Sequence, residues 1–341
     1  MRRVLVPHLI SSRPPDVNAR IHHLSGLTMG TTWSVSLAVD SARLLSPIQA
    51  GIQHQLDIVV AQMSTWEPCS NLSQYNQSDS GTWHDLPDEF FYVLQFALDV
   101  AKETQGAYDP TSGPLVNAWG FGPTAKQTDR PDASTLDAAR VRVGWQKVLL
   151  DNENQRALQS GGIYLDLSAI AKGFAVDQIA RYLTQQGINS YLVEVGGEVR
   201  GAGIKPDALP WWVGLEQPTA FHVQGNTLKE TVIALHDLSV ATSGDYRRYF
   251  TVNDGITPTH YSHTIDPRTG EPIQHGLASV SVIHPDCIMA DAISTALNVL
   301  GAQAGLDFAI KKSIPALFIS RTPDGFIEQM TPEFSALISH D

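Results

Sequence analysis

Apolar and polar positions along the chain follow a helical period in some stretches and a strand period in others. Residues 47–63 carry apolar side chains at an approximately helical spacing, and a second helical pattern begins near Pro87 and stops at Gly106. After Gly30, polar and apolar residues alternate one by one from Thr32 to Leu37. This alternation predicts a half-buried strand.

The most informative pattern change lies in the middle of the chain. Residues 161–165 form a short apolar run, GGIYL, which predicts a buried strand. From about Ile170, apolar residues recur at helical spacing until Gly187, the expected C-terminal stop. Backbone polar groups are free at such a junction, and a helix N-terminus favours an anion. The groups that the junction brings to this position are Asp166, Ser168, the Ala169 carbonyl and Lys172. We therefore expect part of any phosphate-bearing ligand here.

The second half of the chain is rich in strand patterns. Two short strands are predicted around Asp237, and residues 277–285 form a buried strand that leads into a helix from about Asp286 to Leu300. Strands thus occur in consecutive pairs with helices interspersed. This arrangement favours an α+β fold over a doubly wound parallel sheet.

The N-terminal segment and the two cysteines give no signal for a catalytic or metal-binding site. Residues 1–23 are rich in Pro, Arg and Ser, and we expect a disordered N-terminal segment there. Its basic start lacks an unbroken apolar run, and no early cysteine offers a lipid attachment site. We expect a cytoplasmic protein as the sequence is given, with a periplasmic or membrane-anchored location as the alternative. Cys69 and Cys287 lie far apart without metal-ligand spacing, and we interpret them as free thiols.

Length, composition and charge exclude several classes of protein. With 341 residues and 43% hydrophobic composition, the chain can bury a sizeable core. A net charge of −12 without clustered Lys and Arg argues against nucleic-acid binding. No apolar run is long enough for a transmembrane segment. An anionic ligand would need local help from helix N-termini or from a divalent cation.

The predicted helix after Asp286 carries an unusual polar stripe. Asp291, Ser294, Thr295 and Asn298 fall on one face at helical spacing. A hard cation such as Mg²⁺ is bound by carboxylate, hydroxyl and carbonyl oxygens, and Asp291 with Thr295 one turn later could supply one edge of that shell. A solvated helix face is the ordinary interpretation of such a stripe. The absence of Lys, Arg and Glu from it favours a site.

Three further segments give weaker signals. Ser243 and Gly244 are expected in a polar turn, where Gly244 lets backbone N–H groups converge on an anion and Arg247 could clamp a phosphate, although a plain tight turn explains the same residues. His263 is a candidate base or phosphate ligand, or a packed strand histidine. The step from Met29 into the following glycine allows close approach by a flat ligand.

Common catalytic and nucleotide-binding motifs are absent. The sequence contains neither GxGxxG after a strand nor GxxxxGK[ST], so neither a dinucleotide-binding fold nor a P-loop is indicated. It also lacks HExxH, GxSxG and CxxC. The zinc protease, α/β-hydrolase and dithiol redox classes are therefore not supported.

Eight ordered blocks of the sequence resemble one known family. They are MGTTWSV (29–35), MSTWEPCSNLSQYN (63–76), GAYDPTSGPLVNAWGFGP (106–123), DLSAIAKGFAVDQIA (166–180), YLVEVGGEVRGAG (191–203), ATSGDYRRYF (241–250), YSHTIDPRTGEPI (261–273) and ADAISTALNVLG (290–301). In this order and spacing they resemble the ApbE family of FAD:protein FMN transferases, from about Met29 to Gly301. The resemblance implies an α+β fold related to tunnelling-fold proteins, with mixed and antiparallel sheets and packed helices. Residues 24–341 would form this flavin transferase domain.

The resemblance also implies roles for individual residues. The residues placed against FAD are Met29, Trp66, Ala107, Tyr108, Asp109, Asp166, Lys172 and Ile265. The groups assigned to Mg²⁺ are the Ala169 carbonyl, Asp291, Thr295 and Ser294. Trp66 stands where the family commonly has a tyrosine, and Ser294 stands where some relatives have an acid. Asp166 and Lys172 were also singled out by their positions at the predicted strand–helix junction, and Asp291 and Thr295 by the polar stripe of the later predicted helix.

The activity that the resemblance implies uses FAD as a substrate. The enzyme would split the FAD pyrophosphate with Mg²⁺, attach FMN to a Thr or Ser hydroxyl of an acceptor flavoprotein, and release AMP. Asp291 and Thr295 would carry the catalytic cation, and His263, or Asp291 through water, would take the hydroxyl proton. Two alternatives remain: an FAD pyrophosphatase that gives free FMN and AMP, and a maturation module that binds FAD without turnover.

Overall fold

The structure is a computed structural model, which describes residues 2–7, 10, 15, 18–123, 129–218, 228–246, 248–253 and 258–339. The helices are α1 (Ser46–Met63), α2 (Asn71–Gln77), α3 (Asp88–Glu103), α4 (Gly113–Ala118), α5 (Ala133–Arg140), the 3₁₀ turn η1 (Trp145–Lys147), α6 (Ala171–Gln185), α7 (Cys287–Leu300), α8 (Ala302–Lys311) and α9 (Pro332–Ala336). The strands are β1 (Arg3–Leu5), β2 (Ala19–Thr28), β3 (Thr31–Asp40), β4 (Thr82–Asp85), β5 (Leu149–Asp151), β6 (Arg156–Gln159), β7 (Tyr191–Val195), β8 (Glu198–Ala202), β9 (Trp211–Gly214), β10 (Thr231–Leu235), β11 (Leu238–Gly244), β12 (Tyr249–Asn253), β13 (Pro258–Ser262), β14 (Ile265–Asp266), β15 (Glu271–Pro272), β16 (Leu277–His284), β17 (Ala316–Thr322) and β18 (Gly325–Met330).

An eight-stranded sheet forms the centre of the molecule. Its strand order is β18-β17-β16-β11-β8-β7-β3-β2, and every neighbouring pair is antiparallel. A smaller sheet, β1-β10-β9, is mixed, because β1 pairs with β10 in parallel and β10 pairs with β9 antiparallel. These sheets and helices confirm the predicted α+β class.

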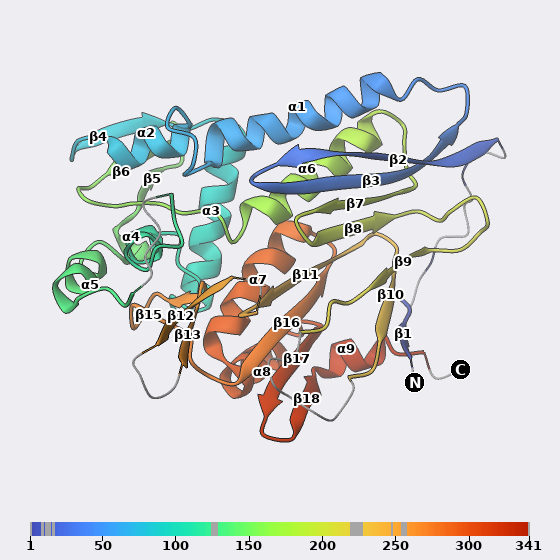
Figure 1. The fold of residues 1–341 in the computed structure, drawn as a ribbon. Coiled ribbons are helices and arrows are strands. Elements are labelled where there is room, and N and C mark those ends of the chain that lie inside the picture. The colour runs from blue at the N-terminus through green and yellow to red at the C-terminus, as the bar shows by residue number, and fades with distance from the viewer. Residues whose placement is uncertain are drawn as a thin grey trace.

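Both faces of the central sheet are covered (Figure 1). Helices α1, α3, α6, α7 and α8 bury one face in the main hydrophobic core, while β1, β10 and α9 cover part of the other face. Strand β17 shows why both faces are apolar: Phe318 packs into the main core, and Leu317 and Ile319 on either side of it pack into the second. Because both faces of such a strand are buried, its sequence lacks the alternation of apolar and polar residues that is typical of a half-buried strand.

Most predicted helices and their ends are confirmed. The patterns at residues 47–63 and after Pro87 are α1 and α3, and the pattern that ends at Gly187 is α6. Gly187 has φ +73°, the left-handed conformation that glycine adopts readily after a helix. No helix among the described residues is long and apolar enough to cross a membrane.

The predicted disordered segment 1–23 contains parts of two strands. Residues Arg3–Leu5 form β1 on the edge of β10, and β2 begins at Ala19, opposite Asp40 of β3. The Arg3 guanidinium lies 2.5 Å from a Glu328 carboxylate oxygen, and Leu5 is fully buried. Composition suggested disorder, but long-range pairing orders these residues.

The predicted strand at residues 161–165 is wrong. The segment belongs to no sheet, and its backbone groups bond to other parts of the chain. The Asn76 side chain accepts from the Leu165 N–H at 2.7 Å and donates to the Leu165 carbonyl at 2.9 Å, and the Asp166 N–H donates to the Pro110 carbonyl. A side chain therefore replaces the neighbouring strand that the apolar run suggested.

Three other segments contain a helix or strand that the sequence patterns did not predict. The segment after Met63 contains α2, and residues 106–123 contain α4. Ser243 and Gly244 belong to β11 rather than to a turn, because their ladder with β16 continues to the pair Gly244–Ser279. Arg247, the predicted phosphate clamp, lies outside the described residues.

Candidate active site

The candidate site lies where the start of α6 meets the middle of α7. Gly173 makes this approach possible: a Cβ on it would lie 2.7 Å from the Asp291 Cβ and closer still to the Cys287 carbonyl oxygen. The Gly173 N–H donates to Asp291 Oδ2 at 2.9 Å. The absence of a side chain at residue 173 thus lets α6 hold Asp291 directly through its backbone.

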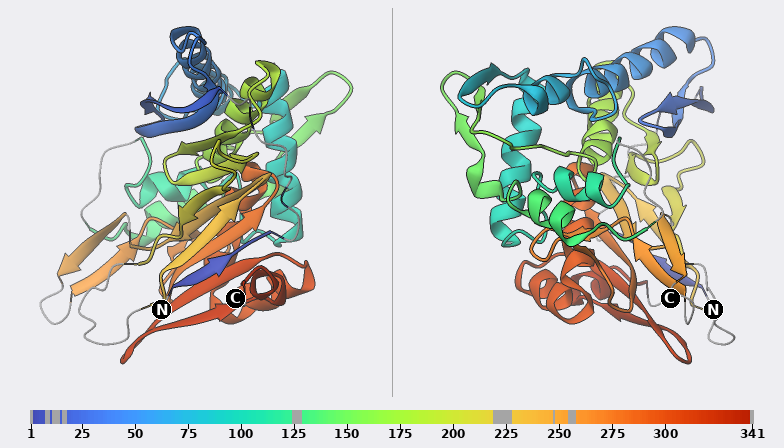
Figure 2. Two further views of the ribbon diagram at one scale, coloured as in Figure 1. Left: turned by 90° about the vertical axis from the view of Figure 1, so that its right-hand side faces the viewer. Right: turned by 60° about the vertical axis from the view of Figure 1, so that its left-hand side comes forward.

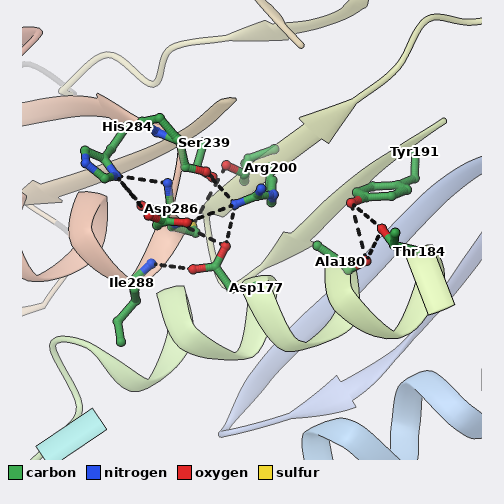
Figure 3. A network of polar contacts seen from close by, with 12 residues as sticks. Asp177, Ala180, Thr184, Tyr191, Arg200, Ser239, His284, Asp286 and Ile288 are labelled. Carbon is green, nitrogen blue, oxygen red and sulfur yellow. Dashed lines mark hydrogen bonds and ion pairs between the residues drawn. The ribbon is translucent and has the colours of Figure 1, made fainter. Parts of the chain in front are cut away.

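A buried carboxylate on α6 fixes the beginning of α7 (Figure 3). Asp177 accepts hydrogen bonds from the N–H groups of Cys287 at 3.1 Å and Ile288 at 2.9 Å, and from the Arg200 guanidinium at 2.8 Å. Burial raises the pKa of Asp177, while the Ile288 N–H and the charge of Arg200 oppose that rise. Because the first turn of α7 is held in this way, Asp291 one turn later has a defined position.

Lys172 lies between two buried carboxylates. Its ammonium is 2.5 Å from Glu198 Oε1 and 3.7 Å from Asp291 Oδ1, and both acidic side chains are only 4% exposed. Burial lowers the pKa of Lys172, but Asp291 and Glu198 outweigh burial, so the net pKa is raised and the ammonium stays charged. Burial raises the pKa of Glu198 to about 7, with Lys172 opposing the rise.

The turn between β7 and β8 lies against Lys172. Gly196 has φ +61°, and a Cβ on it would lie 3.3 Å from Lys172 Cδ and 2.9 Å from Thr31 Cγ2. Its N–H donates to the Thr32 carbonyl. The start of β3, just after Met29, is therefore brought close to the lysine stem.

Strand β11 contributes a hydroxyl to the polar stripe of α7. Ser243 Oγ lies 2.8 Å from Ser294 Oγ and 3.0 Å from Thr295 Oγ1. Ser294 is fully buried and donates to the Asp291 carbonyl at 2.9 Å, whereas Thr295 is partly exposed. Asp291 and Asn298 are also buried, so the stripe is not a solvated helix face.

The oxygen atoms gathered here fit a hard divalent cation. Gly173 donates to Asp291, and the other helix-start bonds of α6 run to Leu167 and Ile170, which leaves the Ala169 carbonyl without a backbone donor among the described residues. Asp291 Oδ1 faces Lys172 at 3.7 Å, beyond hydrogen-bond length. Within the described ranges no group of three or more His, Cys, Asp or Glu side chains could hold a metal. A cation would therefore depend on one carboxylate with hydroxyl and carbonyl oxygens, which suits Mg²⁺.

The loop before α4 adds a buried phenol and one acid. Burial raises the pKa of Tyr108 well above its usual value, and the charges of Asp291 and Asp166 raise it further. Its hydroxyl has no hydrogen-bond partner among the described residues. Asp109 instead holds its own loop, accepting from Thr111 and from the Trp145 N–H.

The remaining residues that are predicted to contact FAD lie in other parts of the structure. Met29 lies in the turn between β2 and β3 with φ +50°, and Trp66 is 60% exposed between α1 and α2. Ala107 and Ile265 are buried in two separate apolar clusters. The structure thus brings Lys172, Asp291, Thr295 and Ser243 together, while Trp66 has no described contact that joins it to them.

His263 lies just after β13, whose hairpin with β12 projects to one side of the molecule (Figure 2, left). Its N–H and its ring Nδ1 each lie 3.1 Å from the Arg248 carbonyl, and Phe121 packs edge-on against the ring. Burial lowers the pKa of His263 to about 4, and the positive charges of Arg248 and Lys172 act in the same direction. Because Nδ1 faces a carbonyl, it carries the hydrogen in the neutral ring, and Nε2 is left as the basic nitrogen.

Two residues of the site had no role in the sequence analysis. Glu198 is an acid inside an apolar strand pattern directly after a glycine pair, and Gly173 is a glycine inside an amphipathic helix. Both are local exceptions to their patterns, and such exceptions often mark functional sites. The sequence could have indicated their importance, but not their partners.

Comparisons with known proteins were made for the whole chain. The model of the ApbE family matches residues 29–318. The "FAD:protein FMN transferase" of Haemophilus influenzae is 39% identical over 328 residues, which cover 93% of this chain and 92% of the relative, and that of Vibrio cholerae is 39% identical over 318 residues with the same coverage. Among solved structures, the apo form of the Pseudomonas stutzeri flavinyl transferase ApbE aligns with a TM-score of 0.85 and 34% identity, covering 94% of this chain and 97% of that one. The flavin transferase ApbE from Vibrio cholerae aligns with a TM-score of 0.84 and 38% identity, covering 94% and 99%.

Proposed function

The chain belongs to the ApbE family, and from this premise we propose that it is a Mg²⁺-dependent transferase that moves FMN from FAD to a Thr or Ser hydroxyl of an acceptor flavoprotein, releasing AMP. The observation that carries the proposal is the meeting of Lys172, Asp291 and Thr295 in one site, formed by two helices far apart in the sequence. A single ammonium beside a set of oxygen ligands suits a pyrophosphate bridged to a divalent cation.

The reaction replaces the phosphoanhydride bond of FAD with a phosphoester bond to the acceptor. The acceptor hydroxyl oxygen forms a bond to the FMN phosphorus, the bond from that phosphorus to the bridging oxygen breaks, and AMP leaves with the bridging oxygen. The residues that would hold Mg²⁺ are Asp291, Thr295 and the Ala169 carbonyl, with Ser294 turned instead toward the Asp291 carbonyl. When bound, the cation would neutralise negative charge that develops on the phosphoryl oxygens. Lys172 contacts the same oxygens and orients the pyrophosphate.

The proton of the acceptor hydroxyl passes to His263 in this proposal. Since its pKa is lowered to about 4 from an ordinary 6.5, the imidazole is neutral at physiological pH and Nε2 can accept a proton. The kcat/KM for transfer, which reports ionisations of the free enzyme, should therefore show no loss from His263 as the pH falls from about 7 to about 5. His263→Gln should lower kcat about 10²- to 10⁴-fold at pH 7. An acid limb near the ordinary histidine pKa, absent from His263→Gln, would contradict this assignment.

Intact-mass analysis tests the proposed function as a whole. The protein is incubated with FAD, Mg²⁺ and a candidate acceptor, and a parallel sample contains EDTA in place of Mg²⁺. We expect an acceptor heavier by one FMN unit, equimolar AMP, and no adduct in EDTA. Free FMN with AMP but no adduct would support an FAD pyrophosphatase. Unchanged FAD with a verified acceptor would support a binding module and overturn the proposal.

A further inference from the structure

We propose that Glu198 is a positioning residue that draws the Lys172 ammonium away from Asp291 and so keeps Asp291 available to a divalent cation. This inference rests on the proposed function, because it assigns a cation to Asp291. Glu198 belongs to β8, which is not part of either helix that supplies the cation ligands. It touches no ligand in the proposal, and its influence passes through Lys172.

The distances define two competing ion pairs of one lysine. The Lys172 ammonium lies 1.2 Å closer to Glu198 than to Asp291, from the two separations of 2.5 Å and 3.7 Å. Only the shorter contact is a hydrogen bond. Asp291 instead takes its hydrogen bond from the Gly173 N–H on Oδ2, and this leaves Oδ1 turned toward the lysine without a hydrogen bond from it.

The charge balance explains why this division favours a cation. With Glu198 ionised, the cluster of Glu198, Lys172 and Asp291 carries one positive and two negative charges in a space where both carboxylates are almost fully buried. The cluster therefore has an unpaired negative charge, which lies at Asp291 as long as Glu198 holds the ammonium. Without the Glu198 charge, the only partner left for the buried ammonium is Asp291, and a direct ion pair there would compete with the cation.

The surroundings of Glu198 support a role in positioning. Gly196 lies against Lys172 Cδ and directs the stem of the side chain past the β7–β8 turn toward Glu198. Glu198 Oε2 is buried and has no hydrogen-bond partner among the described residues, and Lys172 is the described side chain that pairs with the carboxylate, through Oε1. A buried carboxylate that serves only to stabilise a fold usually has all of its acceptors satisfied.

A double-mutant cycle with direct measurement of cation binding tests the inference. The affinity for Mn²⁺, used in place of Mg²⁺, is measured by calorimetry for the full chain, for Glu198→Gln, for Lys172→Met and for the double variant. We expect Glu198→Gln to weaken Mn²⁺ binding about tenfold, which corresponds to about 1.4 kcal/mol. In the Lys172→Met background the same change should have almost no effect, because no ammonium remains to move onto Asp291.

The matched control is Glu194→Gln, in the same hairpin. Glu194 accepts from the Gly197 N–H and from Ser34 and has no described contact with Lys172, so its loss removes an equal charge without freeing the lysine. We expect its Mn²⁺ affinity to stay within about twofold of the unmodified chain. If Glu198→Gln weakens binding equally with and without Lys172, Glu198 acts only through its charge and the inference is wrong. Thermal unfolding of each variant identifies a folding defect, in which case Glu198→Asp takes its place in the cycle and must show the same dependence on Lys172.

Mn²⁺ binding to the unmodified chain and to Asp291→Ala shows which results contradict this inference alone and which also contradict the proposed function. If Asp291→Ala abolishes Mn²⁺ binding while the double-mutant cycle is additive, the cation site stands and the role of Glu198 is overturned. If Asp291→Ala binds Mn²⁺ as well as the unmodified chain, the cation site itself is wrong and both proposals fall.

Discussion

Asp291→Ala is expected to abolish transfer of FMN to an acceptor, with a loss of at least about 10³-fold in rate at saturating Mg²⁺. Asp291 is the only carboxylate in the proposed cation site, and the hydroxyl and carbonyl oxygens that remain are weaker ligands. The rate is measured as the growth of the flavin adduct on an acceptor by intact mass. A variant that labels the acceptor at the unmodified rate would show that the cation does not depend on Asp291.

Asp291→Asn is the control that separates charge from packing. An asparagine has the same shape, and its carbonyl oxygen can still accept the hydrogen bond from the Gly173 N–H. We expect Asp291→Asn to unfold at nearly the same temperature as the unmodified chain and to be almost as inactive as Asp291→Ala. If Asp291→Asn keeps its activity while Asp291→Ala loses it, the carboxylate positions α6 against α7 and does not bind a cation.

Local pattern was enough to predict the elements that carry the site. The helices α6 and α7 follow from apolar periodicity, and the glycine after α6 follows from the left-handed conformation that ends a helix. The polar stripe of α7 also pointed to Asp291 and Thr295, from their spacing and from the absence of Lys, Arg and Glu in the stripe. The ApbE resemblance agreed with these positions and added the residues expected around FAD.

Interactions between distant segments could not be predicted in the same way. The apolar run at residues 161–165 was interpreted as a strand, but the side chain of Asn76 takes the backbone bonds that a neighbouring strand would have made. Likewise, β1 is too short to be recognised by its pattern and exists because β10 pairs with it. In both cases the partner lies more than 80 residues away in the sequence.

The pairing of Lys172 with Glu198 is another long-range interaction. The sequence pattern placed Lys172 at a helix start, and Lys172 does lie in the first turn of α6. It could not show that a carboxylate from β8 already holds the ammonium. The glycine pair before Glu198 signals a tight turn, but only the fold shows that this turn passes over Lys172.

Gly173→Ala is expected to damage both stability and activity, because the smallest possible side chain has no room there. The new Cβ would overlap the Cys287 carbonyl and lie 2.7 Å from the Asp291 Cβ, so α6 and α7 must separate. Overpacking of this kind costs about 1–3 kcal/mol of unfolding free energy. A displacement of Asp291 by about 1 Å should reduce the transfer rate about 10²-fold. Chemical denaturation and the intact-mass assay measure the two effects separately.

Gly214→Ala is the matched control for this prediction. Gly214 lies in β9 with ordinary backbone angles, and a Cβ on it would meet no atom within 4 Å. The same added methyl group should therefore leave both the unfolding free energy and the transfer rate nearly unchanged. If Gly173→Ala behaves like Gly214→Ala, the contact between α6 and α7 is loose enough to absorb a methyl group. The position of Asp291 would then have to depend on the hydrogen bonds that Asp177 accepts from the start of α7, rather than on close packing of the two helices.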